Sequence, residues 1–218
     1  MDENIYVSMS VSASLHWDKN WILRLGESRP ELLLFYSHKV TDEITETCLS
    51  QWYPCRFEVD GVTYTSAGQY MMAEKAKLFG DNKTRTEILN TSNPGKCKVL
   101  GQKVKNFSKA VWDENKENIV MKGSNAKFMQ NSALRTFLLS TGDKVLVEAS
   151  PTDRIWGIGL GKNNPDALDP TKWRGKNLLG FTLMNTRDWI AFLDYFGEFD
   201  EDEEYENDGK NKITEETE

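Results

Sequence analysis

The sequence predicts a mainly helical α+β protein, and three observations lead to this fold class. Several stretches combine strong helix formers with start and stop signals, most clearly residues 66–81. Short runs of β-branched and apolar residues, at 32–36, 56–64 and 144–149, have the length and composition of strands. The 218 residues include 39% hydrophobic residues, enough for one sizeable core or two small ones.

The helix predicted at 66–81 has clear boundaries. Thr65 or Ser66 can cap its first turn through a hydroxyl oxygen, and Gly80 tolerates the left-handed conformation in which many helices end. A glycine in its first turn, Gly68, is locally unfavourable by roughly 0.5–1 kcal/mol relative to alanine. One face of this helix carries Gly68, Met71, Met72, Lys75 and Phe79.

The other elements follow in order along the chain. The apolar run 32–36 predicts a buried strand, and residues 56–64 predict a hairpin that turns at Asp60-Gly61. After the strand at 144–149, residues 150–176 form a loop rich in Gly, Pro, Asn and Asp, and loops of that length are usually functional. Further helices are expected at 81–89, 96–103, 108–120, 125–139 and 177–194.

Both ends of the chain differ from its middle in composition. Residues 1–30 begin with a Ser-rich stretch and contain Trp17 and Trp21, which indicates an extension packed on the domain or a partly ordered arm. Residues 198–208 carry eight carboxylates and no basic residue, so residues 198–218 are expected to form an acidic, disordered tail. Without this tail the remaining chain is close to neutral.

Composition also excludes several classes of protein. Three cysteines without metal-ligand spacing favour a reduced, cytoplasmic protein. Neither a secretion signal nor a run of 18 apolar residues is present, so no membrane span is expected. Two histidines argue against a histidine zinc site or a Ser-His-Asp triad. Nothing in the sequence requires a metal or a cofactor.

The most unusual loop segment is the Gly-rich run 155–161. Its glycines allow backbone N–H groups to approach a phosphate closely. Asp153 precedes the run, and Lys162, Arg174 and Lys176 follow it. Aromatic and charged groups around such a loop suit a nucleotide, with the base on rings and the phosphates on cations. The alternative is a solvated loop with a structural tryptophan.

An ordered set of segments resembles the NADAR family, also called YbiA-like, over roughly residues 32–195. The segments are Phe35-Tyr36, 49–54, 59–61, 67–76, Trp112, 153–159 and 175–180. The resemblance implies one compact α+β domain, mainly helical with a small sheet, which we place at residues 31–197. It also implies hydrolysis of N-glycosidic bonds. Two substrate classes attach to the family: ADP-ribose linked to guanine, including guanine in DNA, and phosphorylated ribosylamino-pyrimidine intermediates of riboflavin synthesis.

The resemblance also identifies candidate catalytic residues. The family has a glutamate where this chain has Gly68, and such a carboxylate can stabilise an oxocarbenium-like sugar or orient water. Gly68 therefore indicates an active-site variant made to trap a ligand, a natural member that binds without cleaving, or an enzyme that uses another carboxylate. Asp153 is the second acid–base candidate, with a turn-forming role as its alternative. Lys75 is placed to meet the missing carboxylate or a ligand phosphate.

Substrate-binding candidates follow from the same matches. Gln51 stands where the family has asparagine, and Trp112 matches a tryptophan expected to stack on a base or ribose. Lys176 and Asn177 are expected to bind phosphate or to cap the last helix. The full set is Phe35, Tyr36, Ser50, Gln51, Trp52, Tyr70, Met72, Trp112, Trp156, Gly157, Gly159, Lys176 and Asn177.

The expected activity is removal of ADP-ribose from guanine bases, and the expected partner is ADP-ribose or an ADP-ribosylated guanine nucleoside or DNA. Two alternatives stay open: a non-catalytic ADP-ribose-binding module, and a hydrolase of riboflavin intermediates. The basic residues form no continuous stripe, so affinity for duplex DNA is expected to be modest, and a flipped or single-stranded base is easier to place in a pocket.

Overall fold

A small parallel sheet lies at the centre of the computed structural model, which describes residues 17–28 and 30–208, the side chains of 27 and 198–208 excepted. Its strands are β1 (Leu32–Phe35) and β4 (Val145–Glu148), paired in register from Leu32 with Val145 to Phe35 with Glu148. All four residues of β4 are buried, because a parallel sheet is normally covered on both faces. The predicted strands at 32–36 and 144–149 are confirmed.

The second sheet is the predicted hairpin. Strands β2 (Phe57–Val59) and β3 (Val62–Tyr64) pair in antiparallel fashion. Asp60 and Gly61 join them with φ angles of 52° and 75°. Positive φ at both central residues is the geometry that favours an Asp-Gly turn in a tight hairpin.

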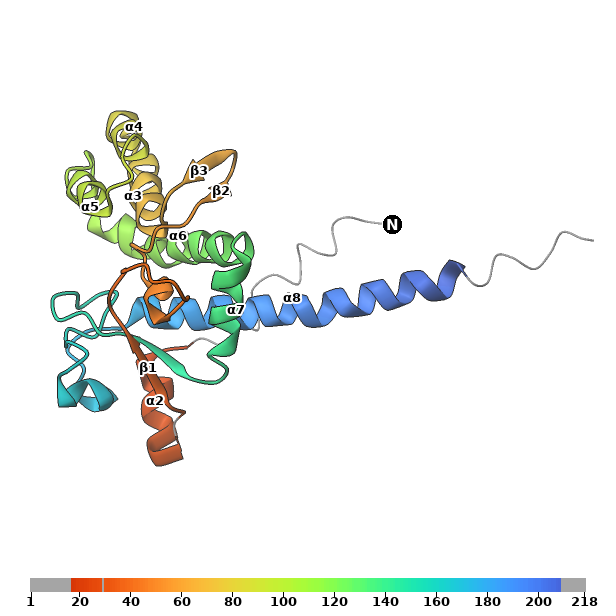
Figure 1. Cartoon of the computed structure of the whole chain (residues 1–218). Helices are drawn as coiled ribbons and strands as arrows, with labels where there is room; N and C mark the ends of the chain where they lie inside the picture. Colours follow the sequence, from red (N-terminus) through yellow and green to blue (C-terminus); the bar gives the residue numbers. More distant parts are fainter. Residues whose placement is uncertain (1–16, 29, 209–218) are drawn as a thin grey trace, which may run out of the picture.

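Helices α3 (Ala67–Leu78), α4 (Asn82–Leu89) and α5 (Pro94–Gln102) form a helical layer on one side of the domain, as Figure 1 shows. The α3 boundaries agree with the sequence prediction. Ser66 Oγ accepts a 3.1 Å hydrogen bond from Gln69 N, and Gly80 has a φ of 70°. Helix α3 packs against α4, α5 and α6, so it is the centre of this layer.

The prediction of separate helices at 108–120 and 125–139 is wrong at the break between them. Helix α6 (Lys109–Met129) runs without interruption through Gly123. A Cβ atom at Gly123 would overlap the Tyr70 ring, so the glycine allows α6 to pack closely against α3. The break comes instead at Asn131, whose side-chain amide donates to Lys127 O and Arg56 O, and α7 (Ser132–Ser140) follows.

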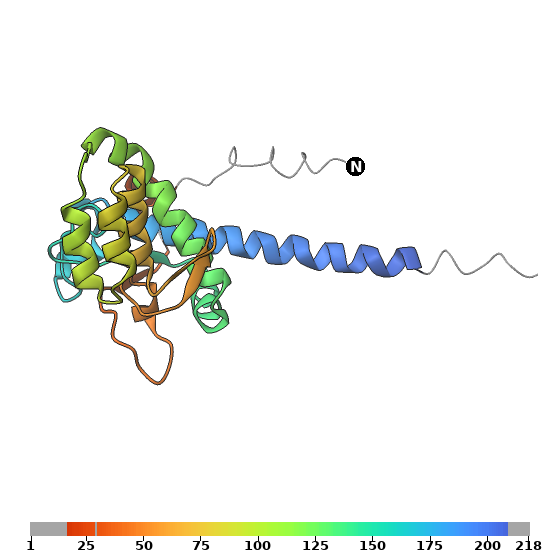
Figure 2. The same ribbon diagram turned by 90° about the horizontal axis from the view of Figure 1, so that it is seen from above.

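The last helix, α8, is longer than the sequence indicates. It spans Leu178–Asp208, which extends beyond the predicted end at 194 and into the stretch assigned to a disordered tail. Glutamate favours helix and no proline interrupts this stretch, so the acidic residues continue the helix. Figure 2 shows α8 projecting from the body. Residues 209–218 lie outside the described residues.

The described part of the N-terminal extension is packed on the domain. Helix α2 (Lys19–Leu25) places Ile22, which is 1% exposed, in the hydrophobic core. Trp17 Nε1 donates a 2.7 Å hydrogen bond to Asp188 Oδ2 of α8. Of the two arrangements considered for the extension, residues 17–28 adopt the packed one, and residues 1–16 lie outside the described part.

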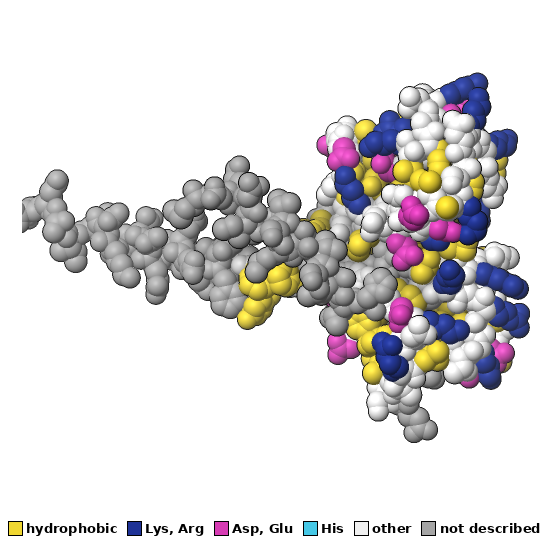
Figure 3. Space-filling model, turned by 180° about the vertical axis from the view of Figure 1, so that it is seen from behind, with side chains coloured by type: hydrophobic (Ala, Val, Ile, Leu, Met, Phe, Trp, Pro, Cys, Tyr) yellow, Lys and Arg dark blue, Asp and Glu magenta, His cyan; other side chains and the backbone are white. Residues whose placement is uncertain are grey.

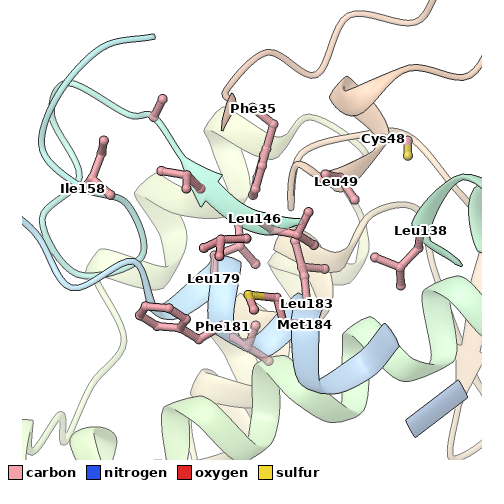
Figure 4. Packing of buried hydrophobic residues seen from close by; sticks show 14 of the residues in the cluster. Phe35, Cys48, Leu49, Leu138, Leu146, Ile158, Leu179, Phe181, Leu183 and Met184 are labelled. Atoms are coloured by element: carbon pink, nitrogen blue, oxygen red, sulfur yellow. The ribbon is translucent and has the colours of Figure 1, made fainter. Parts of the chain in front are cut away.

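The main core joins segments that are distant in sequence. Figure 4 shows side chains from β1, the 3-10 helix η2 (Glu46–Leu49), α7, β4 and α8 packed together. Two short 3-10 helices, η3 (Pro165–Leu168) and η4 (Pro170–Lys172), lie within the 150–176 loop. Among the described helices, none has the length and apolarity needed to cross a bilayer. The chain is thus a mainly helical single domain with two small sheets, as predicted for its class.

Candidate active site

The carboxyl ends of β1 and β4 lie side by side, where ligands commonly bind in folds with parallel strands. The last residues of these strands, Phe35 and Glu148, are partners in the sheet. Phe35 is fully buried in the core, which corrects its assignment as a substrate contact. Tyr36 follows directly and is 49% exposed, so it is accessible at this end of the sheet.

Glu148 is a buried carboxylic acid that sequence reasoning missed. Its residue is 9% exposed, and within the described residues no hydrogen bond or ion pair reaches its carboxylate oxygens. Burial, followed by the negative charge of Asp153, raises the pKa of Glu148 from 4.5 to about 8. The group is therefore mostly protonated at neutral pH. A glutamate that ends the apolar run 145–147 was the signal for it in the sequence.

Asp153 supports the loop that follows β4. Its Oδ1 accepts hydrogen bonds of 2.8 Å from both Ile155 N and Trp156 N, and its carbonyl oxygen accepts from Gly159 N at 3.0 Å. Asp153 thus has the turn-forming role that was considered as its alternative. Its negative charge also contributes to the raised pKa of the Glu148 carboxyl.

Four of the seven backbone N–H groups in the Gly-rich run 155–161 donate hydrogen bonds within the protein. The four at Ile155, Trp156, Ile158 and Gly159 bond to Asp153 or to Glu148 O. The glycines serve close packing instead: a Cβ atom at Gly157 would lie 2.8 Å from Glu148 O. These four amides are therefore not open to a phosphate, and phosphate binding by the other amides of the run stays a prediction.

A buried lysine holds the segment that carries Gln51 and Trp52. Lys127 is 0% exposed, and its ammonium donates to Cys48 O at 2.6 Å and to Ser50 O at 2.9 Å. Gln51 Nε2 lies 3.5 Å from Ser124 Oγ, whereas Gln51 Oε1 is buried without a hydrogen-bond partner. An unpartnered buried acceptor is uncommon in folded proteins and is often found where a ligand binds.

Gly68 lies directly against this segment. Its N–H donates a 2.6 Å hydrogen bond to Gln51 O. A Cβ atom at position 68 would lie 3.0 Å from Gln51 O and 3.1 Å from Trp52 Cδ1. Trp52 is half-buried, with the His38 ring centroid 5.5 Å away and Lys98 Nζ 5.9 Å from its ring. The first turn of α3 and Trp52 therefore form one surface.

Lys75 and Trp112 are brought together further along α3. Lys75 Nζ donates to Gly101 O at 2.8 Å and lies 4.3 Å from the Phe107 ring and 5.5 Å from the Trp112 ring. Burial lowers the pKa of Lys75. Met72, one turn earlier than Lys75, packs against Gly101, which allows α5 to approach α3. This group supplies aromatic faces and one cation.

Two predicted contacts are structural residues. Tyr70 is 2% exposed, and its ring meets the Tyr64 ring edge-on at 5.0 Å in the core beneath the hairpin. Asn177 is fully buried: its Oδ1 accepts from Glu148 N and its Nδ2 donates to Leu146 O, both at 2.9 Å. Both are corrected, because neither side chain is open to a ligand.

The remaining predicted residues lie around the loop after β4. Trp156 is half-buried against the main core, and Lys176 is exposed. Lys176 also lines a cavity of about 490 Å³ together with Arg154 and Arg174. Figure 3 shows Lys and Arg side chains gathered along the edge of the body opposite the projecting helix. Within the described residues, no cluster of His, Cys, Asp and Glu could hold a metal ion.

Comparison of the sequence with known proteins shows which family the chain is related to. Residues 34–191 match the NADAR domain. The chain is 47% identical over 144 residues to N-glycosidase R617 of Acanthamoeba polyphaga mimivirus, covering 64% of this chain and 85% of that protein. It is 34% identical over 134 residues to N-glycosidase YbiA of Escherichia coli, covering 62% and 75%.

A solved structure agrees with the sequence relatives. The NMR structure of the E. coli protein YbiA superposes with a TM-score of 0.63 at 30% identity, covering 77% of this chain and 89% of that one. The domain match, the sequence relatives and the solved structure all indicate the same family. The chain belongs to the NADAR family of YbiA-like N-glycosidases.

Proposed function

We propose that this chain hydrolyses the N-glycosidic bond between ADP-ribose and guanine, in nucleosides or in DNA. The observation that carries the proposal is the buried Glu148 carboxyl beside Asp153, with its pKa raised to about 8. A carboxylic acid that keeps its proton at neutral pH is suited to general acid catalysis, which contributes about 10²–10⁴-fold to a rate. Family membership supplies the reaction class.

In the proposed reaction, the bond between the anomeric carbon and the guanine nitrogen breaks. Its electron pair goes to the nitrogen, and Glu148 donates the proton that neutralises the leaving base. Asp153 stabilises the positive charge that develops on the sugar. Water then adds to the anomeric carbon and returns a proton to Glu148, so the products are ADP-ribose and the unmodified guanine nucleoside or DNA.

The guanine is proposed to bind between the aromatic surfaces of Trp52 and Trp112. Gln51 Oε1 is a buried acceptor without a partner. Guanine carries N–H donors on its Watson–Crick edge that an amide oxygen can accept. Lys75, held beside Trp112, is proposed to contact an electronegative atom of the substrate. A base read in this manner has to leave the stack first, so single-stranded or flipped guanine is the expected form.

Gly68 supports a second candidate function. If the carboxylate that relatives are expected to carry at this position is essential, this chain is a non-catalytic module that binds ADP-ribose. The enzyme and the binding module require different residues. The enzyme needs Glu148 and Asp153 to be sufficient for hydrolysis, whereas the module needs only the aromatic surfaces and the cations.

The experiment follows release of ADP-ribose from ADP-ribosylated guanosine and from an ADP-ribosylated single-stranded oligonucleotide. It compares the full chain with Glu148→Gln, Asp153→Asn and Gly68→Glu, and uses Glu58→Gln, a substitution at an exposed position of the hairpin, as the control. We expect release by the unaltered chain, a loss of about 10²–10⁴-fold in Glu148→Gln, and no effect of Glu58→Gln.

Release only by Gly68→Glu would make the position-68 carboxylate essential and leave the unaltered chain as a binding module. Release by neither form, with ADP-ribose still bound by both, would contradict the enzyme proposal for this substrate. Phosphorylated ribosylamino-pyrimidines are the substrates to test next in that case, because they carry a monophosphate where ADP-ribose carries a diphosphate.

A further inference from the structure

The N-terminal extension and the loop after β4 enclose a cavity of about 490 Å³, within the usual range for small-molecule sites. Its walls come from residues 17–20 of the extension, from Glu117 and Arg154, from residues 173–176 and from the first turns of α8. Four cationic side chains line it, against two acidic ones, Asp18 and Glu117. The cations are Lys19, Arg154, Arg174 and Lys176.

None of the four cations has an anionic partner within the described residues. Lys19 donates to Trp173 O at 3.2 Å, but no ion pair engages Arg154, Arg174 or Lys176. Neighbouring cations in the same loop behave differently, since Lys162 pairs with Glu46 at 2.7 Å and Lys172 with Asp166 at 2.9 Å. The charges of Arg154, Arg174 and Lys176 are therefore available to an anionic ligand in the cavity.

Gly159 brings two of the cationic side chains together. It has a φ of +69°, and a Cβ atom there would lie 3.1 Å from both Arg154 Cγ and Arg174 Cβ. The absence of a side chain at position 159 therefore allows the two arginine stems to share one space. Two arginines that line one cavity provide forked donors that suit the oxygens of a diphosphate.

The extension contributes an aromatic wall. Trp17 is half-buried, its indole N–H is fixed by Asp188, and the Trp21 ring meets it edge-on with centroids 4.1 Å apart. Asp18 caps α2 by accepting from Trp21 N at 2.6 Å. The burial of Ile22 in the core holds the whole segment in place. An aromatic face held beside unpaired cations suits a nucleobase joined to phosphates.

We propose that Trp17 and the cations Arg154, Arg174 and Lys176 bind the adenosine diphosphate part of ADP-ribose, with adenine on Trp17 and the diphosphate on the cations. Arg154 follows Asp153 directly, so a ligand with two ends can occupy this cavity and the carboxylate site together. The extension precedes the residues that match the family domain, which begin at 34. It therefore supplies substrate selection that the domain alone does not. The identity of the ligand rests on the proposed function, whereas nucleotide binding is testable without it.

The test is calorimetric titration of the full chain with ADP, pyrophosphate and adenosine. The double substitution Arg154→Gln with Arg174→Gln should weaken both ADP and pyrophosphate binding by about tenfold or more. Lys83→Gln, at an exposed position of α4 outside the cavity, is the control for an altered charge and should bind as the unaltered chain does. Circular dichroism verifies that each variant is folded.

Variants of Trp17 distinguish adenine binding from diphosphate binding. Trp17→Leu should weaken ADP binding several-fold and leave pyrophosphate binding unchanged. Trp17→Phe keeps a stacking face but loses the bond to Asp188, and should retain most of the ADP affinity. If Trp17→Leu weakened pyrophosphate as much as ADP, or if Trp17→Phe behaved as Trp17→Leu does, the stacking role of Trp17 would be wrong.

Unchanged ADP affinity in the double arginine variant would overturn the inference. Failure of the inference and failure of the proposed function are distinguishable. Nucleotide binding that depends on the arginines, without any release of ADP-ribose from guanine, would preserve this site and reject the enzyme proposal. Release of ADP-ribose with an unchanged KM in the double arginine variant would support the enzyme proposal and reject this nucleotide site.

Discussion

The N–H of Gly68 donates a 2.6 Å hydrogen bond to the carbonyl oxygen of Gln51, which ties the first turn of α3 to the segment that carries Trp52. Position 68 therefore has little space. Any side chain there places its Cβ atom 3.0 Å from Gln51 O, a contact closer than most Cβ atoms tolerate. Substitutions at Gly68 therefore test whether residues 51–52 can move to make room for a side chain.

Gly68→Ala should change the free energy of unfolding by less than about 1 kcal/mol, because two effects oppose each other. Alanine gains about 0.5–1 kcal/mol of helix propensity over glycine, and crowding against Gln51 and Trp52 offsets that gain. Urea denaturation measures the change. A loss of several kcal/mol would mean that the 51–52 segment cannot move by a few tenths of an ångström, and Gly68→Glu would then be a poor test of catalysis.

Glu148 should make stability depend on pH. Its pKa is about 8 in the folded protein against an ordinary value of 4.5, so the folded state binds more protons between these pH values. The free energy of unfolding should therefore fall as pH rises through this range, by about 3 kcal/mol between roughly pH 5.5 and 8. Glu148→Gln, which imitates the protonated acid, should remove this part of the slope in urea denaturation. An equal slope in both proteins would mean that Glu148 is ionised in the folded state.

Lys127→Met should destabilise the protein by about 3 kcal/mol, because the carbonyl oxygens of Cys48 and Ser50 lose a buried donor. Lys122→Met is the matched control on the same helix. Lys122 is exposed and pairs with Asp60 at 3.0 Å, so its loss should cost less than about 1 kcal/mol. Thermal unfolding compares the two. Equal effects would indicate that the Lys127 bonds contribute no more than a surface ion pair does.

Gly123→Ala should destabilise by about 1–3 kcal/mol even though alanine is the better helix former. The new methyl group would overlap the Tyr70 ring, and the α3–α6 contact would have to open. Asn118→Ala, at an exposed position of α6, should instead be neutral or slightly stabilising. Equal destabilisation by both would contradict the explanation by packing against Tyr70, because Asn118→Ala does not touch that contact.

Local signals explain which elements were predictable. The Ser66 cap, the Gly80 terminus and the Asp60-Gly61 turn are decided by neighbouring residues, and each appears where the sequence places it. The continuity of α6 through Gly123 depends on Tyr70, which lies 53 residues earlier in the chain. Such tertiary contacts leave no periodic pattern in the sequence around them.

The sequence supplied the candidate site residues, and which of them contact a ligand stays a prediction. Trp52, Lys75, Trp112 and Lys176 are accessible or half-buried, as ligand contacts must be. Asn177 looked like a phosphate ligand because it precedes a helix, but its amide completes the backbone hydrogen bonds of β4. Glu148 was overlooked because a strand pattern does not show that a carboxylate is cut off from water.

The parallel pairing of β1 with β4 has a consequence for the order in which the domain folds. Leu32 and Val145 are 113 positions apart, and the intervening chain must be closed into a loop before the strands can meet. Contacts of such long range generally form late, because the entropy of loop closure is lost before they stabilise the chain. On a ribosome, the helical layer can assemble while Glu148 is still unsynthesised. The proposed site is therefore complete only after nearly the whole domain has emerged.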